Sequence, residues 1–258
     1  MAIYEKPVKL LFHDMVKELS VQKGKILERD KIISWFRQKY PLIKQGTITA
    51  HLVRLSINAT SRIHYNVDQN GKDDLFFQID SKKYRLYDQV SDPSPIYTKA
   101  QEEEIIATEI ENSTEENEFA YERDLQNFLA KNLSLIEPGL TLYIEEGITG
   151  LEFPVGNKFI DILAKDKGNN YVVVELKVSR GYDRVVGQIL RYMAWIRKNH
   201  AEQNQKVRGI IIAREINEDL LLACSETPNV ELFEYNLSVL LRRIEKTYKT
   251  IKPVTKKR

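Results

Sequence analysis

Cysteine is almost absent from this chain of 258 residues, which contains one, Cys224. A single thiol excludes a disulfide framework and a zinc site built from several thiolates. Its place in the apolar run LLLAC is typical of a small core residue. No segment approaches the roughly 20 apolar residues of a membrane span, and the segment MAIYEKPVKLLFHDM lacks the uncharged apolar core of a signal peptide. We expect a cytoplasmic protein of prokaryotic type that contacts no membrane.

Two kinds of binding motif are also missing. The chain has no glycine-rich phosphate loop, so we expect neither nucleotide hydrolysis nor a nucleotide cofactor. Its four histidines are scattered without the spacing of metal ligands, and we expect ordinary polar or interfacial side chains at His13, His51, His64 and His200.

The net charge of +2 conceals a segregation along the chain. Residues 1–100 contain 17 Lys and Arg against 11 Asp and Glu, and residues 121–258 contain 22 against 18. Residues 101–120, between them, contain 8 glutamates and no basic residue. Two basic regions joined by an acidic connector favour nucleic-acid binding.

Residues 1–90 show helical periodicity followed by a hairpin. Apolar residues recur with the period of a helix in VKLLFHDMVKEL, in RDKIISWFRQKY, where Asp30 is the expected cap, and in GTITAHLVRLSIN. The expected buried side of the third helix comprises Ile48, Leu52, Val53 and Leu55. The segments DLFFQID and KKYRLYD then flank a short turn. Three helices and a hairpin in this order predict a winged helix-turn-helix domain.

The remainder of the chain divides at residue 121. Residues 91–120 predict a solvated acidic linker. In residues 121–258 strand and helix patterns alternate, which predicts an α/β domain. Its strand candidates are TLYIEEG, LEFPV, VRGIIIA and VELFEYNL, and its helix candidates are YERDLQNFLAKNLSLI, GYDRVVGQILRYMAWIRKN, NEDLLLACSE and LLRRIEKTYK, before the tail KPVTKKR.

The stretch FIDILAKDKGNNYVVVELK, residues 159–177, is a hairpin with charges in apolar strands. Asp161 lies in its first strand, and Glu175 and Lys177 lie on one face of the second because side chains alternate along a strand. Charges in strands this apolar are costly unless they bind something. The turn at 167–170 must set the register so that Asp161 faces Glu175. A turn of three residues does this, whereas a turn of two residues needs a bulge.

This set of charges suits hydrolysis of a phosphodiester. Asp161, Glu175 and the backbone carbonyl of Leu176 can bind Mg²⁺, which acidifies its water and clamps phosphate oxygens. Lys177 would orient or help deprotonate the attacking water and stabilise developing negative charge. The alternative is a surface ion pair between Glu175 and Lys177, which would contribute little. The apolar surroundings and the acid in the preceding strand favour the metal site.

These residues, followed by VGQILRYMAWIRKN, resemble the PD-(D/E)XK nuclease superfamily, and more closely the C-terminal catalytic domain of the NucS (EndoMS) endonucleases. The resemblance covers roughly residues 119–245 and includes ERDLQNFLAKNLSLIEPGL. It implies a restriction-endonuclease-like mixed sheet flanked by helices, with the active site at a split in the central strands. It also implies hydrolysis that leaves 5′-phosphate and 3′-hydroxyl ends.

The resemblance assigns roles to further residues. Glu122 matches the helix-borne acid that completes the acidic cluster, although a solvated glutamate in a first helical turn would look the same. Gln188 and Tyr192 match a Q-x-x-R-Y pattern and share one helix face, which would let both point at the metal-bound water or the scissile phosphate. Arg184 and Arg191 are candidate phosphate contacts, or solvated side chains.

Two departures from the family pattern matter differently. Ile160 stands where the superfamily's name has proline, a loosely kept position. The N-terminal region lacks the β-rich module of NucS enzymes and resembles winged-helix modules fused to restriction-type nucleases. Mismatch cutting therefore does not follow from the catalytic domain alone.

The predicted winged helix supplies the DNA contacts. Its second motif helix would place polar side chains in the major groove, with Arg54 as the main base reader. The wing lysines and arginine would contact phosphates. The predicted DNA-binding residues here are Lys44, Thr47, Thr49, His51, Arg54, Lys82, Lys83 and Arg85.

We expect a Mg²⁺-dependent DNA endonuclease of restriction type, in which the winged helix recognises a short site in double-stranded DNA. Mn²⁺ is expected to substitute for Mg²⁺. Cutting both strands of a symmetric site needs two active sites, which favours a homodimer. Two alternatives stay open: a NucS-like repair enzyme acting on mismatched or branched DNA, and a DNA-binding regulator with an inactive nuclease-like domain.

Overall fold

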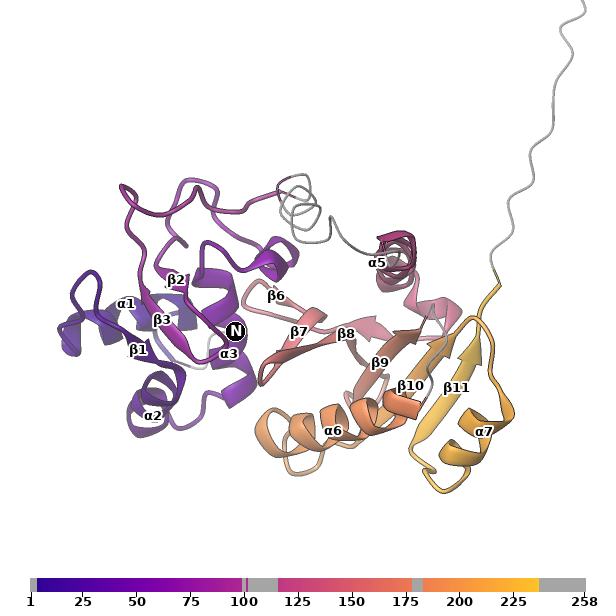
Figure 1. Ribbon diagram of the computed structural model, residues 1–258. Helices are drawn as coiled ribbons and strands as arrows, with labels where there is room; N and C mark the ends of the chain where they lie inside the picture. Colours follow the sequence, from indigo (N-terminus) through magenta and orange to yellow (C-terminus); the bar gives the residue numbers. More distant parts are fainter. Residues whose placement is uncertain (1–3, 99–100, 102–115, 178–182, 237–258) are drawn as a thin grey trace, which may run out of the picture.

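A computed structural model of the chain describes residues 4–98, 101, 116–177 and 183–236 (Figure 1). Much of the predicted linker, the segment LLRRIEKTYK and the tail KPVTKKR lie outside the described residues. A mainly helical N-terminal region lies beside a C-terminal sheet with helices on its two faces. In the part of the chain that is described, no helix is long and apolar enough to cross a membrane.

The N-terminal helices are α1 (Val8–Glu18), α2 (Arg29–Lys39) and α3 (Gln45–Leu55). The apolar residues of α1 that are buried have helical spacing and comprise Val8, Leu11, Phe12 and Met15. Helix α2 begins at Arg29 with Glu28 at the cap position. The prediction that Asp30 caps this helix is therefore wrong: Asp30 lies in the first turn, where a carboxylate still interacts favourably with the helix dipole.

A small antiparallel sheet completes the N-terminal region. It has the order β1-β3-β2 and consists of β1 (Leu27–Glu28), β2 (Phe76–Gln78) and β3 (Lys83–Leu86). A short 3-10 helix, η1 (Thr60–His64), connects α3 with β2. Three helices followed by a hairpin is the order of elements expected from the sequence. The assignment as a winged helix stays a prediction.

The C-terminal region contains a mixed sheet of six strands. These are β4 (Thr141–Leu142), β7 (Leu151–Val155), β8 (Lys158–Lys165), β9 (Tyr171–Lys177), β10 (Val207–Ala213) and β11 (Val230–Glu234). The order is β11-β10-β9-β8-β4, with β7 also paired to β8. Strands β9, β10 and β11 are parallel, whereas β8 is antiparallel to its neighbours. A separate ladder joins β5 (Ile144–Glu145) to β6 (Ile148–Thr149).

Helices cover both faces of this sheet (Figure 1). Helices α6 (Asp183–Asn199) and α7 (Glu218–Ser225) share a core with Val173, and α5 (Glu116–Lys131) shares a second core with Val174. Successive residues of one strand serve opposite cores because strand side chains alternate. A further 3-10 turn, η2 (Leu133–Leu135), follows α5. The expected α/β fold, a mixed sheet flanked by helices, is confirmed.

The N-terminal region shares a hydrophobic core with the C-terminal sheet. Ala50 and Val53 of α3, together with Tyr65, belong to the same buried cluster as Phe153 of β7 and Ile189 of α6. Helix α3 therefore lies between the two regions rather than at the surface. The domain boundaries at residues 90 and 120 stay predictions.

Candidate active site

The β8–β9 hairpin brings the predicted acids together. Its strands pair from Ile162 with Val174 to Lys165 with Tyr171. The backbone N–H of Asp166 donates to the carbonyl of Asn170 at 3.1 Å, which leaves three residues in the turn. Their last member, Asn169, has a left-handed φ of 59°. The register expected from a three-residue turn is confirmed, and it places Asp161 opposite Glu175, one step beyond the last pair.

Asp161 interrupts the ladder with its own side chain. Its carboxylate oxygen Oδ2 accepts a hydrogen bond from the backbone N–H of Leu176 at 2.7 Å. Burial raises the pKa of the Asp161 carboxyl well above its usual range, and the nearby carboxylate of Glu175 raises it further. The two strands therefore separate where a charged group needs space, as expected for a site at a split in the sheet.

Glu175 is the more deeply buried acid, with 1% of its surface exposed. Its Oε1 accepts a hydrogen bond from Gln188 and lies 3.3 Å from the Lys177 ammonium nitrogen. Its Oε2 is buried and has no hydrogen-bond partner among the described residues. Burial raises the pKa of Glu175, although the charge of Lys177 opposes this shift. A buried carboxylate oxygen left unpaired is costly and is a feature of sites that bind a ligand.

Lys177 faces the same acids. Burial lowers the pKa of the Lys177 ammonium, but the charges of Glu175, Glu122 and Asp161 outweigh burial and hold its pKa above the usual value. Lys177 is therefore protonated at neutral pH. A protonated lysine can orient water and stabilise negative charge, but it cannot accept a proton.

Helix α6 brings Gln188 and Tyr192 to this site. Gln188 Nε2 contacts both Glu175 and the Tyr192 hydroxyl, the latter at 3.2 Å. Tyr192 is 1% exposed, and burial, followed by the charges of Glu175 and Asp161, raises its pKa to about 12. The shared helix face expected from their spacing is present. Their catalytic roles stay predictions.

Glu122 lies at the edge of the site. The charge of Glu122 raises the pKa values of Asp161 and Glu175, so Glu122 interacts electrostatically with both acids. Among the described residues, however, no three His, Cys, Asp or Glu side chains lie close enough together to hold a metal ion. The role of Glu122 in completing the acidic cluster stays a prediction.

The remaining donors suit a hard divalent cation. Mg²⁺ binds oxygen, commonly through one or two carboxylates, and keeps several waters. Asp161 and Glu175 offer two carboxylates whose pKa values are raised by burial and by neighbouring carboxylates, a repulsion that a cation would relieve. The unpaired Oε2 of Glu175 is the atom that most needs such a partner. The carbonyl of Leu176 stays a predicted third ligand.

The expectation that α3 has an exposed polar side is wrong. Thr47, Thr49, His51 and Arg54 are each at most 5% exposed. The reason is tertiary packing, since α3 contacts α1 and α2 on one side and β6, β7 and α6 on the other. In this arrangement the four predicted base readers cannot reach base edges in a major groove.

The polar residues of α3 join the two regions instead. Arg54 bonds the Asp73 carboxylate through Nε and Nη2 at 3.1 and 2.9 Å, and it donates through Nη1 to the carbonyl of Glu146 at 2.8 Å. Thr47 donates to Glu145 at 2.9 Å. An arginine whose nitrogens are all engaged by protein is a structural residue.

The other side chains predicted to contact DNA differ in whether they are already paired with an acid of the same chain. Lys44 lies 3.2 Å from the Glu202 carboxylate, and Arg85 forms a bidentate pair with Asp92. Both are therefore neutralised within the chain. The side chains that remain exposed at predicted phosphate contacts are those of Lys82, Lys83, Arg184 and Arg191.

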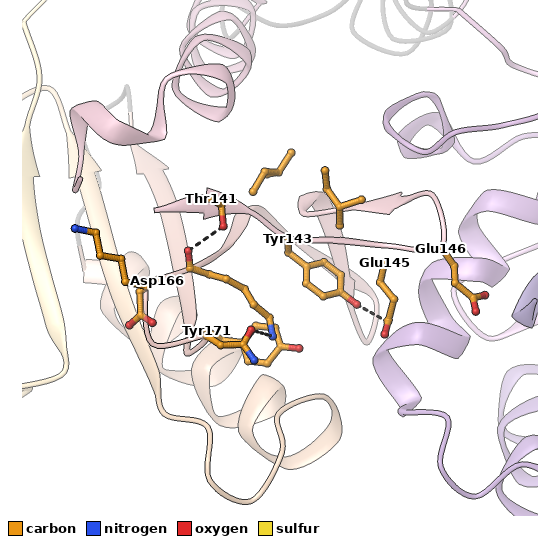
Figure 2. A pocket seen from close by; sticks show the side chains of 11 residues that line it. Thr141, Tyr143, Glu145, Glu146, Asp166 and Tyr171 are labelled. Carbon is orange, nitrogen blue, oxygen red and sulfur yellow. Dashed lines mark hydrogen bonds between the residues drawn. The ribbon is translucent and has the colours of Figure 1, made fainter. Parts of the chain in front are cut away.

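A hollow of about 550 Å³ lies at the opposite end of the β8–β9 hairpin (Figure 2). Tyr143, Lys165 and Tyr171 are among its lining residues, and the Tyr143 hydroxyl donates to Glu145 at 2.6 Å. None of the predicted site residues lines it. The acids thus lie at the other end of the hairpin, outside this hollow.

Sequence reasoning missed two residues at the split. Gln126 of α5 donates through Nε2 to the backbone carbonyl of Asp161 at 2.8 Å. Its position four residues after Glu122, on the same helix face, was an available signal. Glu152 of β7 has a left-handed φ of 45°, and no pattern in the sequence indicates it.

Comparison with known protein families assigns the part of the chain that contains these residues. Residues 121–249, half of the chain, match the family described as the endonuclease NucS C-terminal domain. The chain belongs to the NucS C-terminal domain family. The matched residues include all the acids of the site, so the resemblance stated from the sequence is confirmed. Residues 7–86 match a different model, described as a domain of unknown function (DUF7669).

Curated relatives of the NucS family are similar to part of this chain. Endonuclease NucS of Methanocaldococcus jannaschii is 34% identical over 92 residues, which are 36% of this chain and 32% of that protein. Endonuclease NucS of Pyrococcus furiosus is 36% identical over 77 residues, 29% of this chain and 28% of that protein. The chain thus spans about a third of the length of the curated relatives it matches.

Solved structures show a partial likeness. A repair endonuclease from Pyrococcus abyssi is 25% identical, with a TM-score of 0.36 over 43% of this chain and 45% of that one. EndoMS in its apo form is 24% identical, with a TM-score of 0.37 over 46% of this chain and 47% of that one.

Proposed function

We propose that this chain is a Mg²⁺-dependent DNA endonuclease that resembles NucS repair enzymes in its chemistry. The observation that carries the proposal is the unpaired, buried Oε2 of Glu175 beside Asp161 and Lys177. Family membership supports the same chemistry, because the relatives that match these residues are named endonucleases.

Each site residue would have a separate role in phosphodiester hydrolysis. Asp161, Glu175 and the Leu176 carbonyl would hold the cation, which when bound acidifies water and neutralises phosphate charge. Lys177, protonated beside the acids, would orient the attacking water and stabilise negative charge on the phosphate. Gln188 fixes one oxygen of Glu175 and leaves the other free for the cation.

Mismatched or branched duplex DNA is the proposed substrate. A restriction-type enzyme would need a base-reading surface, and the helix expected to supply it is buried between the two regions. The exposed Lys82 and Lys83 suit phosphate contacts, which carry no sequence information. A NucS-like enzyme that reads the shape of DNA therefore fits better than one that reads a short sequence. A homodimer is proposed as well, since cutting both strands at once needs two active sites.

Cleavage of defined duplexes tests the proposal. Wild type, Lys177→Ala and the control Lys167→Ala are incubated with Mg²⁺ and with perfect, mismatched or branched duplexes. Lys167 is an exposed lysine in the turn of the same hairpin, away from the acids. We expect wild type and Lys167→Ala to cut mismatched or branched DNA and Lys177→Ala to lose cutting.

The other outcomes distinguish the alternatives. Discrete fragments from unmodified or methylated plasmid would indicate a restriction enzyme and overturn the repair assignment. Tight duplex binding without cutting of any substrate, with Mg²⁺ or Mn²⁺, would indicate a regulator with an inactive nuclease-like domain and would overturn the enzymatic function.

A further inference from the structure

The backbone of Asp161 is unsupported on the β7 side of its strand. Strands β7 and β8 pair Leu151 with Ile162 and Phe153 with Ile160, but they skip the position between them, where Glu152 faces Asp161. Glu152 has a left-handed φ of 45°, which is unusual for a residue with a side chain. The ladder therefore fails at the residue that carries the catalytic carboxylate.

A side chain from the opposite layer takes the place of that ladder bond. Gln126 of α5 is 5% exposed, and its Nε2 donates to the carbonyl oxygen of Asp161 at 2.8 Å. A buried carbonyl without a hydrogen-bond partner would lower the free energy of unfolding by about as much as the loss of one hydrogen bond. The hydrogen bond from Gln126 removes that cost and fixes the position of the Asp161 backbone relative to α5. The hydrogen bond from the Leu176 N–H fixes the carboxylate of Asp161.

The N-terminal region forms hydrogen bonds with Glu152, on the β7 side of the interrupted ladder. The hydroxyl of Tyr65 donates to the carbonyl of Glu152 at 2.9 Å, and the hydroxyl of Ser61 donates to the Glu152 carboxylate. Both donors lie at or beside η1, far from β7 in sequence. They bond the backbone and the side chain of Glu152, so they over-determine its left-handed conformation.

We propose that Gln126 and Glu152 are positioning residues for Asp161, and that the N-terminal region shapes the metal site through Tyr65 and Ser61. Metal ligands need placement to within about 0.5 Å, and outer residues that orient them contribute to metal affinity. This inference rests on the proposed function, since it assumes that Asp161 binds a divalent cation.

Direct titration with Mn²⁺ tests the role of Gln126. Calorimetry on the full chain without DNA compares wild type, Gln126→Met and Asn127→Ala. Methionine keeps the volume of Gln126 but cannot donate, and Asn127 bonds within its own helix, to the carbonyl of Arg123. We expect the Kd for Mn²⁺ to rise about tenfold in Gln126→Met and to stay unchanged in Asn127→Ala. Equal Mn²⁺ affinity in all three proteins would overturn the role of Gln126.

A second pair of variants tests the link to the N-terminal region. Tyr65→Phe removes the bond to Glu152. The control Thr149→Val removes a bond of the same kind, from Thr149 to the carbonyl of His64 at 2.9 Å, together with a longer one that Thr149 accepts from the Leu151 N–H at 3.4 Å. We expect the Kd for Mn²⁺ to rise roughly threefold in Tyr65→Phe alone. An equal rise in both, or a rise in neither, would reject positioning through Glu152.

The wild type separates this inference from the proposed function. A chain that binds Mn²⁺ but cuts no DNA would contradict the endonuclease and leave the positioning role intact. A wild type that binds no Mn²⁺ would overturn the positioning role, because there would be no metal ligand to place.

Discussion

Helix α3 and the β8–β9 hairpin both bury a charged side chain, Arg54 and Glu175, but the two side chains differ in their hydrogen-bond partners. The Arg54 guanidinium of α3 donates hydrogen bonds to the carboxylate of Asp73 and to the backbone carbonyls of Glu146 and Asn66. In the hairpin one oxygen of Glu175 finds no partner among the described residues.

A buried charged group that is fully paired stabilises a particular packing, whereas one left unpaired costs stability. Pairing therefore separates the structural Arg54 from the candidate metal ligand Glu175. The imidazole of His51 in α3 is also buried without a hydrogen-bond partner in the part of the chain that is described, but burial keeps it neutral by lowering its pKa to about 3.

The largest effect should come from Glu175→Gln. Cleavage should fall by roughly a thousandfold or more because a metal ligand is lost, while thermal stability should be unchanged or higher. The stability follows from removing a buried carboxylate whose pKa is raised by burial. Cleavage assays and thermal unfolding on the same protein check both. Marked destabilisation would show that Glu175 is a structural residue, as Arg54 is.

Arg54→Ala should show the reverse pattern. It leaves the buried carboxylate of Asp73 with only Lys9 and the backbone N–H of Asp68 as partners among the described residues, and breaking a buried ion pair costs about 3–5 kcal/mol of unfolding free energy. Denaturant unfolding measures this. The partly exposed pair of Arg85 with Asp92 serves as the control, and Arg85→Ala should cost at most about 1 kcal/mol. Similar losses in both variants would contradict the distinction between buried and exposed pairs.

His200 should make the shared core sensitive to acid. Burial, followed by the charges of Lys165 and Lys44, lowers the pKa of His200 to about 3. The unfolded chain binds a proton that the folded chain excludes, so stability falls as pH falls from about 6.5 toward 3. By pH 5 the loss is about 2 kcal/mol.

The variant His200→Phe should remove this part of the pH dependence. The ring would lie among Tyr143, Phe153 and Tyr171, which already surround the imidazole. Denaturant unfolding at pH 7 and pH 5 measures the difference. An unchanged pH dependence in His200→Phe would show that His200 is not the responsible group.

The smallest effect is stabilisation by the cation itself. At a tenfold excess of Mg²⁺ over its Kd, the unfolding free energy should rise by about 1.4 kcal/mol. Thermal unfolding with Mg²⁺ and with chelator measures it, and Glu175→Gln should abolish the shift. A shift that persists in this variant would place the cation elsewhere.

Sequence reasoning was most successful where one strand or helix carries its own pattern. The register of the β8–β9 hairpin followed from its turn, and the strand VRGIIIA appears as β10 with the expected bounds. Gln188 and Tyr192 share a face because they are four residues apart. In each case the spacing of side chains along one element decides the result.

The same reasoning failed where two distant segments meet. In GTITAHLVRLSIN the polar residues Thr47 and Arg54 suggest a solvated helix face, but their partners lie elsewhere along the chain, at Glu145, Glu146 and Asp73. Likewise, nothing near Glu152 in the sequence predicts its left-handed backbone. Its hydrogen bonds come from Ser61 and Tyr65.

The sequence by itself determined the α/β class of the C-terminal region, the FIDILAKDKGNNYVVVELK hairpin and the acids it opposes, because strand alternation and turn length are local properties. Only the tertiary structure decided that α3 is buried and that Gln126 supports Asp161. These depend on which surfaces pack together. A buried polar group takes whichever partner the fold brings within hydrogen-bonding distance, however far away that partner is in the sequence.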